Sequence, residues 1–291
     1  MNKMKQKKYD ISPVIKWAGG KRQLLDKIKN KAPNDFDNYY EPFIGGGAVL
    51  FGLADLLSNK EIVINDINLQ LVNLYNVIKN NSIELIKELE KLDFSHEKSE
   101  DKKVFYYMKR DEYNKKITDL NLINDVKMAA LTIYINKHCF NGLYRVNSSG
   151  LFNVPFNGKE KGNSFDKKNI EELSDFFNEQ KIQILNEDFE SSLKNVKKKD
   201  FVFFDSPYAP IKSDSFEAYT KEGFTYEDHV RLAALYKKLS SEGVYCMLTN
   251  HNTELINDLY KDFNIEVVSV KRMINSDANK RTGEEVIITN Y

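Results

Sequence analysis

The sequence predicts an α/β fold built on a largely parallel sheet. Short apolar segments with strand character alternate with segments of helical periodicity along most of the chain, and such alternation is typical of βαβ units. We expect strands at 39–43, 61–68, 181–185, 201–204, 244–249, 265–270 and 285–291. Only a loop separates the last two strands, so we expect them to form an antiparallel hairpin at one edge of the sheet.

The middle of the chain interrupts this alternation. Helical patterns run over 69–92 and around 104–140, and residues 141–168 are rich in Asn, Gly and Ser with few helical signals. This change of pattern predicts an inserted, mainly helical domain. The expected domains are a main domain formed by 1–68 and 168–291, and an inserted domain at 69–167.

The composition is that of a globular protein. The chain has 291 residues, 41% of them hydrophobic and 12% aromatic, which is enough apolar material for a large core. No apolar run approaches the ~18–20 residues of a membrane span, and the basic N-terminus has no apolar stretch behind it, unlike a secretory signal. The two cysteines and four histidines show no ligand spacing. We therefore expect a cytoplasmic protein with no metal site and no membrane partner.

The formal charge is balanced, with 43 Lys and Arg against 43 Asp and Glu. This balance argues mildly against binding a polyanion over the whole surface, but it permits a local basic face. Basic clusters occur at 3–8, 194–199 and 271–281, and the first two are equally well explained as solvated surface. The third lies in the loop between the last two predicted strands, where Lys271 and Arg272 are candidates for phosphate contacts.

Three consecutive glycines, Gly45 to Gly47, follow the first predicted strand and precede a helical pattern. Glycines at this place allow a tight turn and close approach of a ligand to the backbone. Asp66 lies about one βα unit later, at the end of the next strand, where a carboxylate accepts hydrogen bonds from ribose hydroxyls. The pattern G-x-G-x-x-G is absent, so a plain tight turn remains an alternative to a nucleotide site.

The segment "KWAGGKRQLL" (16–25) holds the only tryptophan of the chain. Trp17 stands beside two glycines and between Lys16 and Lys21. An aromatic ring with flexible flanks and nearby cations suits a nucleotide-like ligand. The alternative is the start of an N-terminal helix after a loop.

The segment "FVFFDSPYAP" (201–210) ends an apolar strand on a carboxylate. Ser206 precedes a proline and is therefore biased toward an extended conformation. The Asp205 carboxylate and the Ser206 carbonyl could accept two N–H donors of an exocyclic amine, while Tyr208 lies flat against its ring. Two acceptors would also stabilise positive charge on an attacking nitrogen. An Asx-type turn after a buried strand is the alternative.

These motifs together resemble the Dam-type family of DNA adenine-N6 methyltransferases (D12 class, alpha group), including the GATC-methylating enzymes of DpnII-type restriction–modification systems. The likeness runs in the family's order from about Pro13 to Tyr291. It is carried by "KWAGGK" (16–21), "EPFIGGGAVLF" (41–51), "NDIN" (65–68), "FNGLYRVNSSGLFNVPFN" (140–157), "EDF" (187–189), "DSPY" (205–208) and a tail ending in "EEVIITNY". One such motif would be weak, whereas six in order are specific. The chain departs from the family at Ser206, where proline is usual.

The resemblance implies a Rossmann-like methyltransferase sheet that uses S-adenosylmethionine and no metal, with an inserted helical DNA-recognition domain. The donor site would be lined, by motif match, by Trp17, Lys21, Phe43, Gly45, Gly47, Asp66, Asp188 and Phe189. Asp66 would bind the ribose of the donor, and Asp188 and Phe189 would hold its adenine.

The resemblance also implies residues for catalysis and for DNA binding. The target adenine would be held by Asp205, Ser206, Pro207 and Tyr208. The base-reading segment would contribute Phe140, Asn141, Leu143 and Arg145, with Lys16 as a further base or phosphate contact. An Arg145 fork would match the O6 and N7 acceptors of guanine, although a solvated charge is the alternative.

The reaction implied is methyl transfer to N6 of an adenine flipped out of duplex DNA, with GATC as the expected site. A cognate GATC endonuclease of the same system is an expected partner, without direct contact. Three alternatives remain. They are a methyltransferase acting on RNA or on a protein amide, a catalytically impaired DNA-binding homologue suggested only by Ser206, and a dinucleotide-dependent oxidoreductase, which the missing third glycine of the pattern disfavours.

Overall fold

The structure is a computed structural model of the 291-residue chain, and it describes residues 9–17, 19–117, 124–159, 162–210, 223–271 and 282–291. Arg272 and the basic residues that follow it up to 281 lie outside the described residues, as does the cluster at 3–8.

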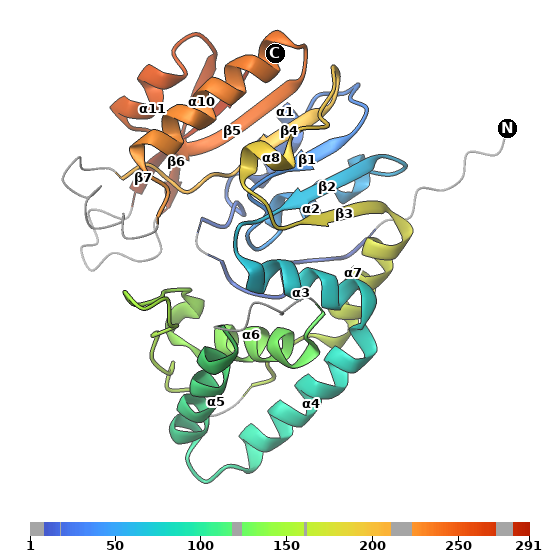
Figure 1. The fold of residues 1–291 in the computed structure, drawn as a ribbon, viewed down its shortest axis with the longest axis vertical. Coiled ribbons are helices and arrows are strands. Elements are labelled where there is room, and N and C mark those ends of the chain that lie inside the picture. Colours follow the sequence, from blue (N-terminus) through green and yellow to red (C-terminus); the bar gives the residue numbers. More distant parts are fainter. Residues whose placement is uncertain (1–8, 18, 118–123, 160–161, 211–222, 272–281) are drawn as a thin grey trace, which may run out of the picture.

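A seven-stranded sheet forms the centre of the fold (Figure 1). Its strands are β1 (Tyr39–Glu41), β2 (Glu61–Asn65), β3 (Lys181–Leu185), β4 (Phe201–Phe204), β5 (Tyr245–His251), β6 (Asn264–Lys271) and β7 (Thr282–Thr289). They lie side by side in the order β3-β2-β1-β4-β5-β7-β6. Strands β1 to β5 are parallel, whereas β7 runs antiparallel to both β5 and β6. The predicted α/β sheet and its antiparallel C-terminal strand pair are therefore confirmed.

The helices connect and cover these strands. They are α1 (Leu25–Lys31), α2 (Ala48–Gly52), η1 (Ala54–Leu56), α3 (Leu69–Asn80), α4 (Ser82–Lys98), α5 (Lys102–Ile117), α6 (Val126–His138), η2 (Phe140–Gly142), α7 (Lys167–Glu179), α8 (Phe189–Ser192), α10 (Tyr226–Ser241) and α11 (Glu254–Leu259). No helix of the described segments is long and apolar enough to cross a membrane.

The helical pattern predicted over 69–92 is two helices and not one. Asn81 leaves the helical region with φ −139° and ψ 36°, so it ends α3 and precedes α4. Asparagine favours such junctions because its side chain competes for backbone hydrogen bonds. The pattern around 104–140 is also divided, since α5 ends at Ile117 and α6 begins at Val126.

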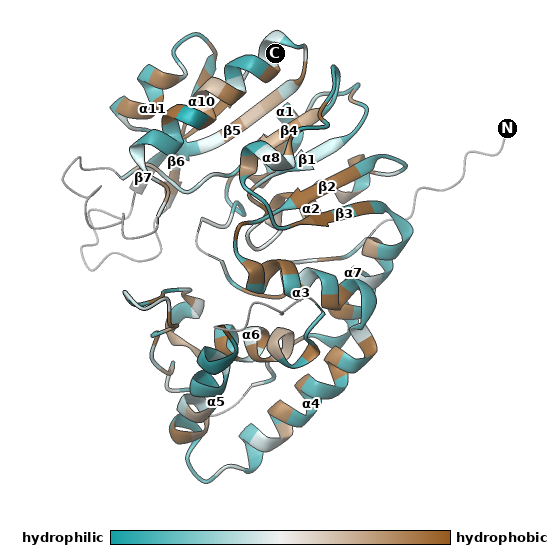
Figure 2. Cartoon of the chain, viewed as in Figure 1, coloured by the Kyte–Doolittle hydropathy of each residue, from teal (hydrophilic) through white to brown (hydrophobic). Residues whose placement is uncertain are grey.

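The central strand β4 shows how the two sides of the sheet are filled. All four of its residues are buried, because a parallel strand inside a sheet is covered on both faces. Phe201 and Phe203 pack into one apolar core with α1, α2 and α3, and Val202 and Phe204 pack into a second core with α10. The apolar strands and the amphipathic helices around them are visible as brown segments in Figure 2.

Helices α4 to α6, together called the helical segment, extend from the β3 side of the sheet. Helices α4, α5 and α6 lie away from the strands, and α3 and α7 stand between them and the sheet (Figure 1). Residues Met128 to Asn136 of α6 are all buried, so α6 is surrounded by protein. The core on the Phe203 side of the sheet continues without interruption through α3 into α5 and α6.

Two buried histidines stack within this helical segment. The rings of His96 and His138 have centroids 4.3 Å apart, and the Tyr134 hydroxyl lies 2.7 Å from His96 Nδ1. His138 Nε2 lies 3.1 Å from the Ser164 hydroxyl, which donates to Asp93. Burial, with smaller effects from His96 and Lys137, lowers the pKa of His138 to about 3. Burial also lowers the pKa of His96, so both rings are neutral in the folded protein near pH 7.

The histidine stack predicts a loss of stability in acid. Because the pKa of His138 is about 3 when folded and about 6.5 when unfolded, its contribution is present above pH 6.5 and is lost as the pH falls toward 3. We expect the free energy of unfolding of wild type to fall between pH 7 and pH 5 by on the order of 1–2 kcal/mol more than that of His138→Gln. Urea unfolding of both proteins at several pH values measures this difference, and identical pH profiles would contradict it.

Candidate active site

Four loops meet at the carboxyl-terminal end of the sheet, because each follows the end of a parallel strand. The loops after β1, β2, β3 and β4 carry the glycine turn, Asp66, Asp188 and Asp205 respectively. The strand order reverses between β1 and β4. In doubly wound sheets, ligands bind at the strand ends where the order reverses.

The glycine turn needs glycine for two reasons. Gly45 and Gly47 have φ of +50° and +77°, a region that side chains disfavour. In addition, a Cβ on Gly45 would lie 2.9 Å from the Trp17 indole, and one on Gly47 would lie 2.6 Å from the Phe51 ring. Tyr75 of α3 donates a hydrogen bond to the Gly45 carbonyl at 2.7 Å. The turn is therefore closely packed from behind and fixed in shape.

Asp66 lies against this turn. Its Oδ2 accepts a hydrogen bond from the Gly45 amide and its Oδ1 accepts one from the Asn68 amide, both at 2.9 Å. Burial raises the pKa of Asp66 to about 6, although the Asn68 and Gly45 N–H groups oppose this rise. Each carboxylate oxygen keeps a second lone pair, which a hydroxyl could use.

Asn65, which precedes Asp66, joins three of the loops. Its buried amide donates to the carbonyls of Pro42 and Glu187 at 3.0 and 2.9 Å, and its oxygen accepts from the Glu187 amide at 2.9 Å. The loops after β1, β2 and β3 are thus held at fixed distances by one side chain.

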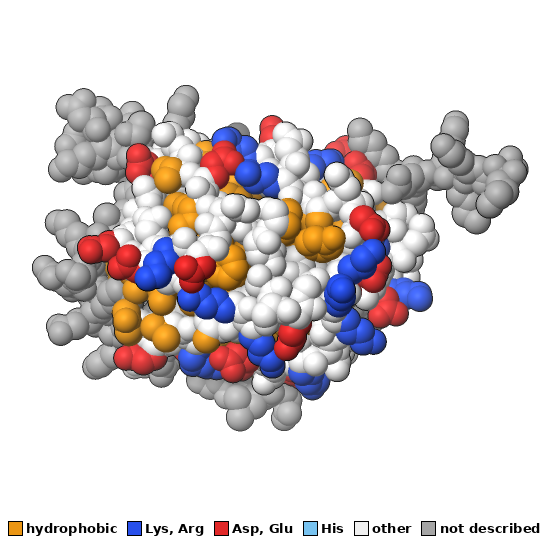
Figure 3. Space-filling view, turned by 90° about the horizontal axis from the view of Figure 1, so that it is seen from above, with side chains coloured by type: hydrophobic (Ala, Val, Ile, Leu, Met, Phe, Trp, Pro, Cys, Tyr) orange, Lys and Arg blue, Asp and Glu red, His pale blue; other side chains and the backbone are white. Residues whose placement is uncertain are grey.

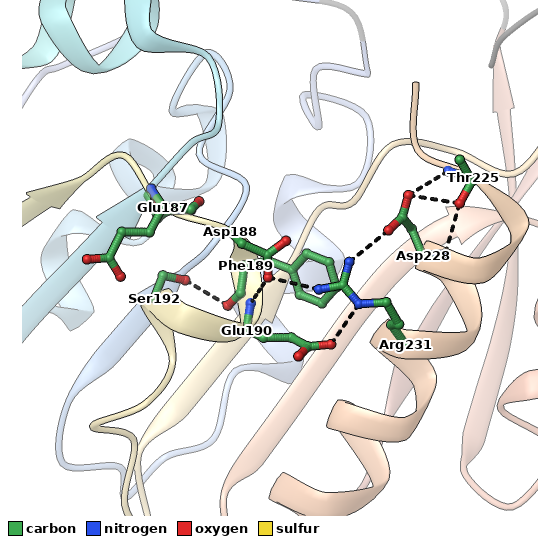
Figure 4. Close-up of polar contacts among 9 residues, drawn as sticks. Glu187, Asp188, Phe189, Glu190, Ser192, Thr225, Asp228 and Arg231 are labelled. Atoms are coloured by element: carbon green, nitrogen blue, oxygen red, sulfur yellow. Dashed lines mark hydrogen bonds and ion pairs between the residues drawn. The ribbon is translucent and has the colours of Figure 1, made fainter. Parts of the chain in front are cut away.

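Asp188 is held from α10 (Figure 4). Its Oδ1 accepts from the Glu190 amide, as the N-cap of α8, and from Arg231 Nη2, both at 3.0 Å. Arg231 also bonds Glu190 and Asp228, and its guanidinium lies 4.9 Å from the centroid of the Phe189 ring. Ion pairs this exposed contribute little to stability individually, but the network fixes the direction of the Asp188 carboxylate.

Aromatic rings line the same side of the site. The rings of Phe43 and Phe189 are 5.4 Å apart at an angle of 32°, and Phe224 meets both rings within 5.8 Å. Phe43 comes from the loop after β1, so this cluster joins that loop to the loop after β3. A flat apolar wall beside the Asp188 carboxylate suits a planar heterocycle that carries an amine.

Asp205 forms a buried ion pair. Lys21, whose side chain is 1% exposed, places Nζ 2.5 Å from Asp205 Oδ1, and Thr249 donates to the same oxygen at 3.3 Å. Burial raises the pKa of Asp205, while the Lys21 ammonium and the Thr249 hydroxyl oppose the rise. Lys21 was expected to line the donor site, and the structure brings it to the Asp205 loop.

Tyr208 is enclosed on three sides. Its hydroxyl donates to Glu285 Oε2 of β7 at 2.7 Å, and the His251 ring meets it edge-on at 4.5 Å between centroids. Lys21 Nζ lies 4.6 Å from the centroid of the Tyr208 ring. Burial, together with the carboxylates of Asp205 and Glu285, raises the pKa of Tyr208, so its hydroxyl stays protonated.

The segment 16–21 connects the sheet to the helical segment. The Asn136 amide on α6 accepts from the Lys16 N–H and donates to the Lys16 carbonyl, both at 2.8 Å, and it donates to the Gly142 carbonyl at 3.2 Å. Trp17 packs on the Tyr144 ring with centroids 4.8 Å apart. The predicted base-reading segment at 140–145 therefore lies beside the glycine turn.

Most candidate base-contacting side chains lie at the surface. Phe140 is 49% exposed, Asn141 is exposed with φ +57°, and Leu143 is half-buried. Arg145 is exposed, and its Nε donates to Asn153 Oδ1 at 2.7 Å across a short hairpin. This contact orients the guanidinium, so Arg145 is not merely a freely solvated charge.

Acidic and basic side chains of the described residues are interspersed on the face seen in Figure 3, which matches the neutral formal charge. Lys16 is exposed and bonds Asn136 through its backbone, near the predicted base-reading segment. The described residues contain no group of three or more His, Cys, Asp and Glu side chains that could hold a metal ion.

Several residues of the site were not predicted from the sequence. They are Asn65, Arg231, Asn250, His251 and Glu285. The polar end "TNHN" of an otherwise apolar strand at 245–251 is a signal that could have indicated Asn250, by the same argument that indicated Asp66 and Asp205. Arg231 and Glu285 carry no such signal, because only the strand and helix arrangement brings them to the site.

The fold and the site define an α/β protein of the doubly wound type, with a polar site at the strand ends where the order reverses. The chain belongs to the D12 class N6 adenine-specific DNA methyltransferase family, whose model matches residues 17–274. It is therefore a site-specific, adenine-specific DNA methyltransferase. Membership of this family implies S-adenosylmethionine as the methyl donor.

Named relatives agree with this assignment. The type II methyltransferase M1.LlaDCHI of Lactococcus lactis subsp. cremoris is 39% identical, covering 100% of this chain and 99% of that protein. The type II methyltransferase M.MjaIII of Methanocaldococcus jannaschii is 41% identical, covering 97% and 100%. The DNA adenine methylase of Escherichia coli K12 is 30% identical, covering 95% and 94%.

The packing of the glycine turn predicts a large cost for Gly47→Ala. The added Cβ would combine a left-handed backbone with a clash against Phe51, so we expect a loss of roughly 2–4 kcal/mol in the free energy of unfolding. Gly158→Ala is the matched control, because Gly158 has φ +75° but open space around its Cβ. We expect it to lose only about 1–2 kcal/mol in urea unfolding. Equal losses would show that crowding at Gly47 is unimportant.

Proposed function

We propose that the protein methylates N6 of adenine within GATC, holding the flipped base at residues 205–208. The observation that supports this proposal best is the arrangement after β4. One oxygen of Asp205 is engaged by Lys21 and Thr249, and the Tyr208 ring is fixed beside it. The choice of GATC is supported by the likeness of residues 140–157 to GATC-methylating enzymes.

The residues around the glycine turn fit S-adenosylmethionine. Asp66, held by the Gly45 and Asn68 amides, would accept from the ribose hydroxyls. The Asp188 carboxylate would accept from the amine of the donor's adenine, with Phe43 and Phe189 against its ring. The glycines let Trp17 and Phe51 pack directly against the turn, which keeps its shape fixed for the donor. The donor supplies a methyl group that is already activated by a sulfonium charge.

The chain's own groups would act on the target amine. Among the described residues, Lys21 and Thr249 both contact Asp205 through Oδ1, so we assign Oδ2, with the Ser206 carbonyl, as acceptors of the two N6–H donors. The two hydrogen bonds that these oxygens accept favour rehybridisation of N6. The carboxylate stabilises the positive charge that develops on N6 as it attacks the methyl group of the donor. Tyr208 would stack on the base. Lys21 balances the buried charge of Asp205 before the base arrives.

We propose residues 69–167 as the target-recognition part of the chain. Arg145 would read a guanine through its oriented guanidinium, and Phe140, Asn141 and Leu143 would occupy the space around the flipped base. Lys16, beside η2, would contact a base or phosphate. Lys271 and Arg272 stay candidates for phosphate contacts.

The cellular setting follows from the substrate. We propose that the enzyme works in the cytoplasm, on nucleoid DNA. Two relatives are named type II methyltransferases, which supports a cognate GATC endonuclease in the same system, although no direct contact between the two proteins is required.

Expression in a host that lacks GATC methylation tests the site and the catalytic loop together. We expect DNA from cells with wild-type protein to resist an endonuclease that cuts only unmethylated GATC. DNA from cells with Asp205→Ala should be cut, because the variant loses an acceptor for the amine and the rate falls by at least roughly 10³-fold.

The purified variant provides the control. Asp205→Ala removes the charge that pairs with buried Lys21, so we expect a lower free energy of unfolding. A cooperative unfolding transition and donor binding by calorimetry should nevertheless remain, and these two measurements separate lost chemistry from lost structure. Full cleavage of wild-type DNA would exclude GATC as the target. Protection by Asp205→Ala would instead exclude Asp205 as a catalytic residue.

Arg145→Ala tests guanine reading. We expect the variant to lose about 1–3 kcal/mol of transition-state binding on GATC oligonucleotides and to discriminate less at one guanine. Single-turnover methylation of duplexes with each position substituted in turn measures both quantities. A uniform loss on all sequences would make Arg145 a phosphate contact.

A further inference from the structure

The end of strand β5 contacts each of residues 205–209, which follow β4. The two strands are parallel neighbours, with Phe204 paired to Leu248. The next residues of both strands therefore lie side by side. Thr249 contacts Asp205, Asn250 contacts Ser206, Pro207 and Ala209, and the His251 ring packs on Tyr208.

Asn250 makes most of these contacts through one fully buried amide. Its Nδ2 donates to the Ser206 hydroxyl at 3.3 Å and lies 3.4 Å from the Pro207 carbonyl. Its Oδ1 accepts from the amides of Ala209 and His251 at 2.8 and 2.9 Å. Because buried amides are costly without partners, this set of bonds favours a single loop conformation.

The hydrogen bond from Asn250 matters more for the shape of the loop with serine at position 206 than it would with proline there. A proline at this place would fix φ by its own ring, whereas serine is restrained only by the proline that follows it. Ser206 is 1% exposed, and its hydroxyl accepts from Asn250. The hydrogen bond thus restrains the backbone whose carbonyl is assigned to the target amine.

Neighbouring groups support the same loop. Glu285 of β7 is the register partner of His251 and accepts from the Tyr208 hydroxyl. His251 Nδ1 lies 3.0 Å from the Ala209 carbonyl, which makes Nδ1 the protonated nitrogen. The described residues Asp205, Tyr208 and Ala209 are therefore held by contacts with β5 and β7.

We propose that Asn250 is a positioning residue for methyl transfer, whose amide replaces the rigidity of a proline ring by bonding Ser206 and holding residues 206–209 toward the target amine. Asn250 acts through this loop and does not touch the substrate. The inference rests on the proposed role of the Asp205–Tyr208 loop.

Steady-state kinetics of Asn250→Ala test this proposal. We expect kcat to fall by roughly 10–100-fold, because the loop loses its alignment with the methyl donor. The KM values for DNA and donor should change by less than about threefold, since binding uses other residues. Asn73→Ala is the matched control. Asn73 is also fully buried, and its amide pairs with the backbone of Asp125 and not with the loop after β4.

A double-mutant cycle with Ser206→Pro separates positioning from a general loss of packing. If the proline ring substitutes for the Asn250 hydrogen bond, Asn250→Ala should lower kcat less in the Ser206→Pro background than in wild type. We expect the two falls in kcat to differ by roughly two- to fivefold. A cavity left by the amide would give additive effects, because proline at 206 does not refill it.

The outcomes are distinct. A selective kcat loss with rescue supports the inference. A loss no greater than that of Asn73→Ala at equal stability, or additive effects in the cycle, would overturn it. Asp205→Ala, assayed in parallel, tells the two proposals apart. If Asp205→Ala is inactive while Asn250→Ala is fully active, only the positioning role fails. If Asp205→Ala is active, the proposed catalytic loop itself fails.

Discussion

The buried ion pair between Lys21 and Asp205 is the constraint on which the rest of the site depends. A lysine with a 1% exposed side chain is tolerated only beside a compensating charge, and its partner comes from the end of β4. Trp17 and Lys16 are held by other contacts, Trp17 against the Tyr144 ring and Lys16 through its backbone bonds with Asn136. The N-terminal segment is attached to the loop after β4 through Lys21 and to α6 through Asn136.

Three buried asparagines perform related tasks around this pair. Asn65 joins the loops after β1, β2 and β3, Asn136 joins the N-terminal segment to η2, and Asn250 holds the loop after β4. An amide side chain can donate and accept at once, so it replaces a backbone partner that an irregular loop lacks. The site thus consists of charged and aromatic groups on loops, which neutral amides hold in place.

The sequence predicted the strands, the C-terminal antiparallel pair and the motifs, because these features depend on local patterns. It missed the break at Asn81, since periodicity continues on both sides of that residue. It also missed Arg231 and Glu285, because their contacts with Asp188 and Tyr208 depend on strand order and helix placement. Asp66 and Asp205 were accessible to prediction because a polar residue that ends an apolar strand is a local signal.

One apolar core joins the sheet to the helical segment. It runs from Phe203 of β4 through Leu74 of α3 to Leu131 of α6. A helical segment that shares its interior with the catalytic sheet is not a transferable module, because exchanging it would expose or mismatch the common core. Asn141 and Arg145, by contrast, project from that segment at the surface. Under the proposed role of this segment in target recognition, new specificities would arise by replacing individual exposed side chains, while the shared interior would keep recognition and chemistry in one folding unit.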